Sequence, residues 1–491
     1  MPGTHIEKLY RPPFGLFLDL YHLTMAYGFW KNELAERRAA FHLFYRSPPF
    51  DHPFVLAAGL ELVIDVLESF RFAPEDIQYL GGLRGSTGAP LFSEAFLNYL
   101  QRWQFQCDID AVPEGTVVFP HQPLLRAEGP LLQVQILESA MLNLINFSSL
   151  IATKAGRMVR AAQGDAILEF GLRRAQGIDG ALTASRSAFI GGVQATSNVM
   201  AGRYYGIPVK GTHAHSWVML FDEEVEAFRA YARAMPDNCI FLVDTYDTLE
   251  GVRHAIQVGR AMREAGYEMN GIRLDSGDLA DLSRKARRML DEAGFPEATI
   301  VASNNMDEYR VAGLKGKGAP IDTWGIGTRL VTAQDDPALG GVYKLSAVQA
   351  ADGSWEDRIK LSEETIKISN PGRQQVKRFF DGNGRPCGDM LYDPYHAYDA
   401  TFMDYTGEKT YNLAGKAGTD LLQPIYRKGK LVYEVPDLKA VRAYCQGQQK
   451  LFEGIHPASY PLGLESGLHA RKKRQVAQIR LELENPEKAN P

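Results

Sequence analysis

The chain has 491 residues, of which 45% are hydrophobic, and this size and composition are typical of two globular domains. Its 54 basic and 59 acidic residues give a formal net charge of −5, which excludes a general electrostatic surface for nucleic acid. The four cysteines stand far apart without a C-x-x-C pair, so neither a disulfide framework nor a cysteine zinc site is expected.

The first residues, MPGTHIEKLYRPP, contain no basic segment followed by an apolar one, so no export leader is expected. No stretch of the chain approaches the roughly 18 apolar residues that a membrane span requires. We therefore expect a cytoplasmic protein that has no membrane partner.

Residues 1–140 are expected to form one part of an α/β domain. Within them, FDHPFVLAAGLELVIDVLESFRF (50–72) has the apolar spacing of an amphipathic helix. Residues 108–136, DIDAVPEGTVVFPHQPLLRAEGPLLQVQI, predict β-like segments that are separated by proline and glycine.

Residues 141–350 follow a different pattern, in which short apolar or β-branched runs alternate with helical stretches. The runs are AILEFGLRR, IPVKGTHAH, CIFLVDTYDT, GIRLDSGDL, TIVASNN, IDTWGIGT and then GVYKLSAV. Alternating strands and helices indicate a parallel sheet, and near-continuous apolar strands indicate that both faces are covered. Because the span is shorter than the about 250 residues typical of a complete eight-stranded barrel, we expect an irregular or incomplete (β/α) barrel.

The last part of the chain, residues 351–491, does not share this rhythm. Its segment KISNPGRQQVKRFFDGNGRPCGDMLYD (367–393) predicts strands joined by D-G and N-G turns. The tail HARKKRQVAQIRLELENPEKANP (469–491) predicts a helix with a solvated basic face. We expect residues 1–140 and 351–491 to form together a smaller α/β domain that is split between the two chain ends.

Polar side chains collect where the predicted barrel strands end, which is where barrels carry their chemistry. In GIRLDSGDL, period-two alternation places Arg273 and Asp275 on one face at the strand's carboxyl end, either as an internal ion pair or as a functional pair. Asp278 is expected to cap the next helix. Asp244 and Asp247 in LVDTYDT suit either helix caps or Mg²⁺ ligands.

Two further strand ends suit anions. Gly325 and Gly327 in IDTWGIGT let backbone amides approach a ligand, and Thr328 adds a hydroxyl, as in phosphate sites. Arg173 and Arg174 are adjacent in AILEFGLRR, so alternation turns one of them inward, where a guanidinium suits carboxylate or phosphate. The rim as a whole suits a phosphorylated, metal-bound substrate.

The motif PVKGTHAHSWVM (208–219) carries two histidines, His213 and His215, at the end of a predicted strand. A zinc site is one interpretation, but the later strand ends offer Asp and Asn instead of further histidines. A second interpretation makes one histidine a nucleophile whose tautomer is held by Asp244 or Asp275. The third is a pair of packed or capping histidines, and these residues alone leave the last two open.

Taken together, these segments resemble the nicotinate phosphoribosyltransferases of NAD salvage. The matching segments, in the family's order, are LFLDLYHLTMAY (16–27), EFGLRRAQG (169–177), KGTHAHSW (210–217), LVDTYDT (242–248), IRLDSGDL (272–279), SNN (303–305), WGIGTRLVT (324–332) and KISNPGRQQVKR (367–378). The resemblance implies a type II phosphoribosyltransferase, with an irregular α/β barrel beside a smaller split domain and usually a head-to-tail homodimer.

The implied reaction joins nicotinate to 5-phosphoribosyl 1-diphosphate and gives nicotinate mononucleotide and diphosphate, coupled to ATP hydrolysis. Mg²⁺ is the implied cofactor, and the sequence does not fix its ligands. Through the matching motif G-T-x-A-H, the resemblance implies that His215 is phosphorylated by ATP. Asp275 is assigned with His215 to the catalytic centre.

The resemblance also assigns the substrate contacts. Thr212 in the histidine motif, Arg273 before D-S-G-D and Tyr21 in D-L-Y-x-L-T would meet nicotinate. Tyr21 lies far from the barrel in sequence, so we expect it to act across the subunit interface. The residues implied for phosphoribosyl diphosphate are Thr328 and Gly327 of G-I-G-T and Arg173 of F-G-x-R.

Two positions depart from the family's pattern. His213 is not part of the histidine motif and is interpreted as incidental, and Leu18 stands where threonine is common. Two alternative functions stay open. Nicotinamide phosphoribosyltransferase shares the fold and the phosphohistidine, and a non-catalytic nucleotide-sensing homologue would retain the pocket without the reaction.

Overall fold

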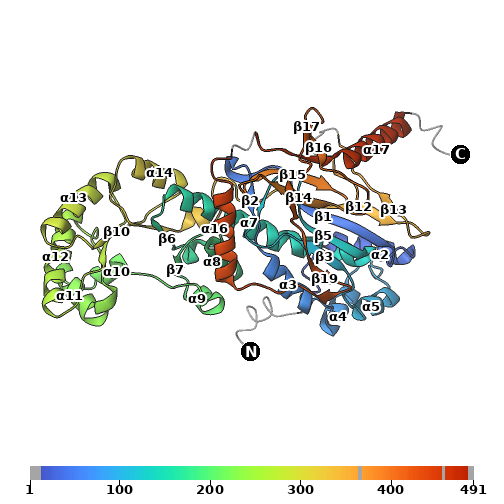
Figure 1. Ribbon diagram of the computed structural model, residues 1–491. Helices are drawn as coiled ribbons and strands as arrows, with labels where there is room; N and C mark the ends of the chain where they lie inside the picture. Colours follow the sequence, from blue (N-terminus) through green and yellow to red (C-terminus); the bar gives the residue numbers. More distant parts are fainter. Residues whose placement is uncertain (1–12, 363–367, 456–458, 485–491) are drawn as a thin grey trace. The chain divides into compact units, whose positions relative to one another are not determined.

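The computed structural model describes residues 13–362, 368–455 and 459–484 (Figure 1). The chain divides into two units, and we call them the central unit, Ser148–Ala338 with Leu438–Gln446, and the flanking unit, Met1–Phe147 with Leu339–Asp437 and Gly447–Pro491. The N-terminal stretch in which no leader is expected lies almost wholly outside the described residues, as do Lys367 and the end of the C-terminal tail.

The central unit is built on a sheet of six parallel strands. The strands are β6 (Ala166–Glu169), β7 (Ala195–Thr196), β8 (Ile240–Leu242), β9 (Gly271–Leu274), β10 (Thr299–Ala302) and β11 (Thr323–Ile326). Their order in the sheet is β7-β6-β11-β10-β9-β8. The first strand of the series therefore pairs with the last, which is the cyclic order of a barrel, whereas β7 and β8 form the two edges. The order is consistent with the predicted incomplete barrel.

Helices follow the strands of the central unit, as the alternating pattern predicts. They are α7 (Glu138–Ala161, from Ser148 onward), α8 (Gly177–Ile190), α9 (Val199–Tyr205), α10 (His215–Val218), α11 (Glu224–Ala234), α12 (Thr248–Glu264), α13 (Leu279–Glu292), α14 (Glu308–Gly316) and α15 (Thr328–Val331), with short 3₁₀ turns η2 (Leu172–Arg174) and η3 (Pro236–Asn238). In Figure 1, α11 to α14 follow one another along one side of the strands. The apolar strand residues are buried beneath them, among them Ile272, Leu274, Ile300 and Trp324.

Aspartates begin three of these helices. The carboxylate of Asp278 accepts from the Ala280 and Asp281 amides at 3.1 and 3.2 Å. Asp247 accepts from the Glu250 amide at 2.9 Å, and Asp307 caps α14 in the same way. Such caps satisfy backbone amides that have no partner inside the helix. The predicted cap at Asp278 is confirmed, and Asp247, which the sequence left open, is a cap as well.

The flanking unit contains two larger sheets and a short strand pair. The seven-stranded sheet runs β13-β12-β1-β5-β3-β19-β20, the six-stranded sheet runs β17-β16-β21-β15-β14-β18, and β2 pairs with β4. The strands are β1 (Arg38–Tyr45), β2 (Val55–Leu56), β3 (Asp108–Ala111), β4 (Val117–Val118), β5 (Pro123–Pro130), β12 (Gly341–Gln349), β13 (Trp355–Asp357), β14 (Gln375–Phe380), β15 (Pro386–Tyr392), β16 (Thr401–Asp404), β17 (Thr410–Asn412), β18 (Ala417–Asp420), β19 (Gln423–Arg427), β20 (Lys430–Leu431) and β21 (Leu462–Glu465).

The helices of this unit come from both chain ends. They are α2 (Leu20–Lys31), η1 (Pro49–Asp51), α3 (Leu60–Ser69), α4 (Pro74–Gly82), α5 (Glu94–Gln101), α6 (Leu131–Ile136), the start of α7 and α17 (Ser466–Glu484), while α16 (Leu438–Leu451) begins in the central unit and ends in this one. In the described part of the chain, no helix combines the length and the apolarity that a membrane crossing requires.

Three sequence predictions are corrected here. The run GVYKLSAV is not part of the parallel sheet, because β12 pairs antiparallel with β1 from Ala39 to Tyr45 in the flanking unit. The unit boundaries shift accordingly, with residues 141–147 and 339–350 in the flanking unit and 438–446 in the central unit. The amphipathic helix predicted over 50–72 is shorter, because Pro53 and the left-handed Gly59 interrupt it before α3.

The predicted β-like region and the basic tail also differ in part. The segment LLQVQI at the end of the region 108–136 is helical, as α6. The tail forms the helix α17, but its basic face is not wholly solvated. Arg471 pairs with Asp393 and Asp357, and the Lys472 ammonium donates to the Asn370 side chain at 2.7 Å. Burial lowers the pKa of Lys472 to about 8.

Candidate functional site

The carboxyl ends of parallel strands meet at one edge of their sheet, and in the central unit this edge carries a polar network. The Arg273 guanidinium, at the end of β9, donates from Nε to the Ser303 hydroxyl at 2.8 Å, from one terminal nitrogen to the Thr212 hydroxyl at 3.3 Å and from the other to the Asp275 carboxylate at 3.1 Å. The Ser303 hydroxyl donates in turn to Asp275. The structure therefore brings the predicted residues Thr212, Arg273 and Asp275 together.

The end of β8 supports this network from the next strand. One carboxylate oxygen of Asp244 accepts from the Asp275 amide at 2.9 Å and from the Ser276 hydroxyl at 2.6 Å. The other oxygen, Oδ1, is buried and has no hydrogen-bond partner among the described residues. Asp244 thus fixes the turn that follows β9 and presents one unsatisfied oxygen.

His215 is the first residue of α10, close to the end of β8 in the structure. Its Nδ1 atom lies 3.1 Å from the Thr245 hydroxyl, whereas Nε2 has no partner in the described part of the chain. The prediction that Asp244 or Asp275 holds this imidazole is wrong, because both carboxylates are engaged with the turn after β9 and with Arg273. Thr245, directly after Asp244, takes that role.

His213 is not incidental, as the sequence suggested, but is part of the sheet's packing. Its ring is 7% exposed and lies 4.8 Å from the Tyr231 ring, between centroids. Its Nε2 atom accepts from the Leu242 amide of β8 at 3.3 Å. Burial lowers the pKa of His213 to about 4, and the charges of Arg273 and His215 act in the same direction. The ring is therefore neutral at pH 7.

The two histidines of H-x-H do not form a zinc site in this arrangement. One ring is held against β8 and the other against Thr245, and the described residues contain no cluster of three or more His, Cys, Asp or Glu side chains that could bind a metal. The zinc interpretation, disfavoured on the sequence, finds no support here.

We expect the neutral His213 to make the protein sensitive to mild acid. The unfolded chain binds a proton with a pKa near 6.5, whereas the folded ring does so only near 4. As the pH falls from 6.5 towards 4, the unfolded state gains a proton at this site before the folded state does. The free energy of unfolding therefore falls by about 1.4 kcal/mol per pH unit, or about 3 kcal/mol over the whole range. Above pH 6.5 the site has no effect on stability.

The stabilities of wild type and His213→Gln are measured by thermal or urea unfolding at pH 7 and pH 5. The loss of stability between pH 7 and pH 5 should be larger in wild type than in the variant. Equal losses of stability in the two proteins would contradict the assignment of a depressed pKa to His213.

The ends of β6 and β11 carry the residues predicted to bind phosphate. Thr328 opens the single-turn helix α15 directly after Gly327. Gly171, which precedes η2, packs on α15 so closely that a Cβ atom on it would lie 2.2 Å from Val331. Arg173 lies in η2 next to this contact, so Arg173, Gly327 and Thr328 share one corner of the strand edge.

The prediction that one of Arg173 and Arg174 points inward is wrong. The strand ends at Glu169 and the chain turns into η2, where both arginines are exposed. Arg173 has no partner among the described residues. This leaves its guanidinium available to an anionic ligand.

Three residues that the sequence analysis did not assign shape this edge. Glu169 is 1% exposed and accepts from the Gly171 amide and from the Ser185 and Thr196 hydroxyls, and this holds the turn that leads to Arg173. Phe170 follows it, and its ring centre lies 5.8 Å from the Arg273 guanidinium carbon. Ser303 orients Arg273. The signals were present, since a glutamate interrupts the apolar run AILEF and a serine ends TIVAS.

Tyr21 belongs to the flanking unit and so is not among the residues that the parallel sheet brings together. It lies on α2, is half exposed and packs against the His22 ring at a tilt of 41°, with 3.9 Å between ring centroids. Burial raises the pKa of Tyr21 above its ordinary value, and the carboxylates of Glu138 and Asp19 add to this. Its ring is accessible to a ligand or to another chain.

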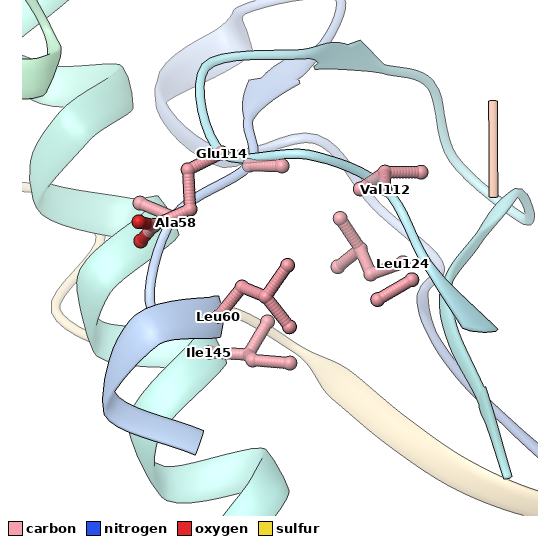
Figure 2. Close-up of a pocket in the computed structure, with 8 residues that line it drawn as sticks. Ala58, Leu60, Val112, Glu114, Leu124 and Ile145 are labelled. Atoms are coloured by element: carbon pink, nitrogen blue, oxygen red, sulfur yellow. The ribbon is translucent and has the colours of Figure 1, made fainter. Parts of the chain in front are cut away.

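A small cavity in the flanking unit is not a substrate site (Figure 2). Its volume is about 10 Å³, which is room for about one water molecule. Figure 2 shows mostly apolar side chains around it, with the Glu114 carboxylate at one side. That carboxylate accepts from the Gly59 amide at 2.5 Å and so has a structural role in the turn before α3.

Comparison with known proteins extends over nearly the whole chain. Models of the nicotinate phosphoribosyltransferase (NAPRTase) family match in three parts, the N-terminal domain at residues 16–146, the family model at 166–358 and the C-terminal domain at 373–472. The nicotinate phosphoribosyltransferase of Bacillus subtilis is 40% identical over 96% of this chain and 96% of its own. One from Mycobacterium tuberculosis is 41% identical over 88% of this chain and 86% of its own.

A solved structure supports the same relationship. The crystal structure of human nicotinic acid phosphoribosyltransferase is similar with a TM-score of 0.82 at 32% identity, and the match covers 93% of this chain and 99% of that chain. The predicted α/β fold class is confirmed, with a parallel sheet whose order is consistent with an incomplete barrel, and the second unit is built from both chain ends as expected. The expectation that this split unit is the smaller one is wrong, because it contains more of the chain than the central unit does. On the sequence matches, the shared fold and the motifs at the strand edge, the chain belongs to the nicotinate phosphoribosyltransferase family.

Proposed function

We propose that the protein transfers the phosphoribosyl group of 5-phosphoribosyl 1-diphosphate to nicotinate, with ATP hydrolysis, and so makes nicotinate mononucleotide for NAD salvage. The observation that carries this proposal is the arrangement around Arg273. Its side chain is 16% exposed and held by Ser303, Thr212 and Asp275. A guanidinium carries five N–H groups, so three are used here and two remain, the number that a carboxylate accepts in a bidentate pair.

The surroundings of Arg273 also suit the pyridine ring. The Phe170 ring lies close to the guanidinium and offers an aromatic face. Thr212 has a hydroxyl next to Arg273 in the same network. A flat anion whose carboxylate pairs with Arg273 can therefore pack its ring against Phe170. Tyr21 would supply a second aromatic face.

If Ser303 orients the guanidinium, its removal should weaken nicotinate binding without removing any charge. We expect Ser303→Ala to raise the nicotinate KM about tenfold, the equivalent of one hydrogen bond of about 1.4 kcal/mol. The KM for phosphoribosyl diphosphate, which is assigned to another corner of the edge, should not change. Steady-state kinetics with each substrate varied in turn measures both values, and an unchanged nicotinate KM would remove Ser303 from this role.

The corner formed by Arg173, Gly327 and Thr328 suits the phosphate groups of the second substrate. Arg173 offers a free guanidinium, and Thr328 offers a hydroxyl at the start of α15. Planar guanidinium groups pair well with phosphate oxygens. As diphosphate leaves, the ribose carbon becomes cation-like, and these donors stabilise the charge that builds up on the leaving group.

The edge also fits a magnesium ion. Asp244 presents a buried oxygen that has no partner among the described residues, and Asp275 lies next to it in the network. A dedicated protein cage is not required, since Mg²⁺ is commonly held by one or two carboxylates together with substrate phosphates. Asp244 and Asp275 would hold the ion, which would neutralise the charge of the diphosphate.

His215 is assigned the ATP-dependent step. Thr245 fixes its ring through Nδ1 and leaves Nε2 free, so the imidazole can present a nitrogen to a phosphoryl donor. In this step an N–P bond forms to the γ-phosphorus of ATP while the bond to the ADP oxygen breaks. Water later hydrolyses the N–P bond and releases phosphate. In between, the ring carries a strongly anionic group next to the substrate edge, which can couple ATP to substrate binding.

We further propose a homodimer in which Tyr21 of one subunit completes the edge of the other. Tyr21→Ala and His215→Ala should each be strongly impaired. When the two variants are co-expressed in equal amounts, half of the dimers are mixed and each mixed dimer has one intact site, so activity should return to about one quarter of wild type. A mixture that stays as inactive as the single variants would place Tyr21 and His215 of one chain in the same site.

The proposed function is tested by incubating the purified protein with nicotinate, phosphoribosyl diphosphate and Mg²⁺, with and without ATP. Nicotinate mononucleotide and diphosphate should form in both samples, faster with ATP, and ADP should appear in the second. Binding of the substrates without release of diphosphate would contradict the proposal and would support a nucleotide-sensing protein instead.

A further inference from the structure

The parallel sheet of the central unit is open between its edge strands, β7 and β8, and the His213 side chain is one of those that bridge this opening. After α9 the chain runs beside β7, where the Thr196 amide donates to the Pro208 carbonyl and the Lys210 amide donates to Thr196, both at 3.0 Å. No strand ladder joins this segment to β8 in the described residues. The connection is made instead by the loop Gly211–His215, whose central residue is His213.

The hydrogen bonds of β8 show why a hydrogen-bond acceptor is needed at the position of the His213 ring. Val243 donates its amide to the Arg273 carbonyl of β9, so the neighbouring amide, that of Leu242, faces away from β9. It is buried on the open side of the sheet, where an unpaired amide would be costly. The Nε2 atom of His213 accepts from it at 3.3 Å. One weaker contact, from the Asn238 side chain to the Gly211 carbonyl at 3.5 Å, lies beside it.

His213 stands between two of the residues assigned to the reaction. Thr212, the residue before it, accepts from Arg273, and His215, two residues after it, lies against Thr245. The ring itself is enclosed by aromatic side chains, with centroids 4.8 Å from Tyr231 and 6.0 Å from Phe228. A shift of the His213 ring would therefore move the loop on both sides of it.

We propose that His213 is a positioning residue, which closes the open side of the parallel sheet through Leu242 and thereby fixes Thr212 against Arg273 and His215 against Thr245. The inference rests on the proposed function for its kinetic consequences, but not for its structural one. His213 is not among the residues assigned to a substrate. The low pKa keeps the ring neutral, and in the tautomer that carries its proton on Nδ1 the Nε2 atom has the lone pair that accepts the Leu242 amide.

Two nearly isosteric variants test the inference. In His213→Gln the amide oxygen reaches the position of Nε2 and can still accept from Leu242, whereas in His213→Asn the shorter side chain reaches only the position of Nδ1. A third variant, Tyr231→Leu, loosens the same aromatic enclosure without removing the acceptor. All three leave the side chains assigned to the substrates unsubstituted, and thermal unfolding verifies that each variant is folded.

The first readout is hydrogen exchange of the Leu242 amide. We expect exchange to be roughly tenfold faster in His213→Asn and to stay near the wild-type rate in His213→Gln and Tyr231→Leu. The second readout is kinetic. His213→Asn should raise the nicotinate KM roughly tenfold and reduce the stimulation by ATP, while the KM for phosphoribosyl diphosphate stays unchanged, and His213→Gln should restore both properties.

The outcomes separate the two claims. Unchanged exchange at Leu242 in His213→Asn would overturn the inference, as would Tyr231→Leu reproducing its kinetic effects, since packing alone would then explain them. If wild type makes no mononucleotide but exchange at Leu242 follows the expected order, the closure by His213 stands and the proposed function fails.

Discussion

The His215→Ala variant is expected to lose all stimulation by ATP and to keep a slow transfer that does not depend on ATP. The reason is that His215 provides the only assigned acceptor for the phosphoryl group, whereas Arg273, assigned to nicotinate, and Arg173 and Thr328, assigned to phosphoribosyl diphosphate, belong to other strand ends. The rates with and without ATP should become equal in the variant, and ADP formation should cease.

The measurement is the initial rate of mononucleotide formation at saturating substrates, with and without ATP, together with ADP release. Thr245→Ala is a matched control, since it keeps the imidazole and removes only the group that orients it. It should retain part of the stimulation. If His215→Ala responds to ATP as wild type does, His215 has no part in the coupling.

The Arg273→Ala variant is expected to raise the nicotinate KM by about 30-fold to 1000-fold. Removing one partner of a close, poorly exposed charge pair costs about 2–4 kcal/mol, and each 1.4 kcal/mol is a factor of ten. The KM for phosphoribosyl diphosphate should change much less, because Arg173 and Thr328 lie at the ends of other strands.

Arg273→Lys is the control for charge alone. It keeps the cation but not the planar fork, so its nicotinate KM should lie between those of wild type and Arg273→Ala. Thermal unfolding of each variant checks that the substitution has not unfolded the protein. A nicotinate KM that is the same in all three proteins would contradict the carboxylate role.

Local sequence patterns correctly predicted the positions of several side chains at the strand ends. Alternation in GIRLDSGDL correctly put Arg273 and Asp275 side by side, because both belong to one short buried strand and its first turn. The cap at Asp278 followed from its position before a helical pattern. Such features depend on residues that are close in the chain, so a short segment of sequence is enough to predict them.

Features that depend on contacts distant in sequence were missed. The run GVYKLSAV resembles the barrel strands in composition, but it pairs with β1, some 300 residues away, and no local pattern shows this. The partner of His215 was assigned to a carboxylate, yet it is Thr245, because Asp244 is occupied by the next turn. The acceptor role of His213 likewise depends on an amide in β8.

The side-chain direction at the end of β6 was missed for a different reason. Alternation assumes that the strand continues, but the chain turns at Gly171, where Val331 leaves no room for a larger residue. Both arginines are therefore exposed. Strand periodicity is informative only as far as the last paired residue.

A competition in one reaction tests whether the Arg273 network selects a pyridine carboxylate for phosphoribosyl transfer. Equal concentrations of nicotinate and nicotinamide are incubated with the protein, phosphoribosyl diphosphate, Mg²⁺ and ATP, and both mononucleotides are quantified. We expect nicotinate mononucleotide to be the dominant product of the wild-type protein, and we expect Arg273→Ala to lose this preference. Nicotinamide mononucleotide as the main product of the wild-type protein would contradict this expectation.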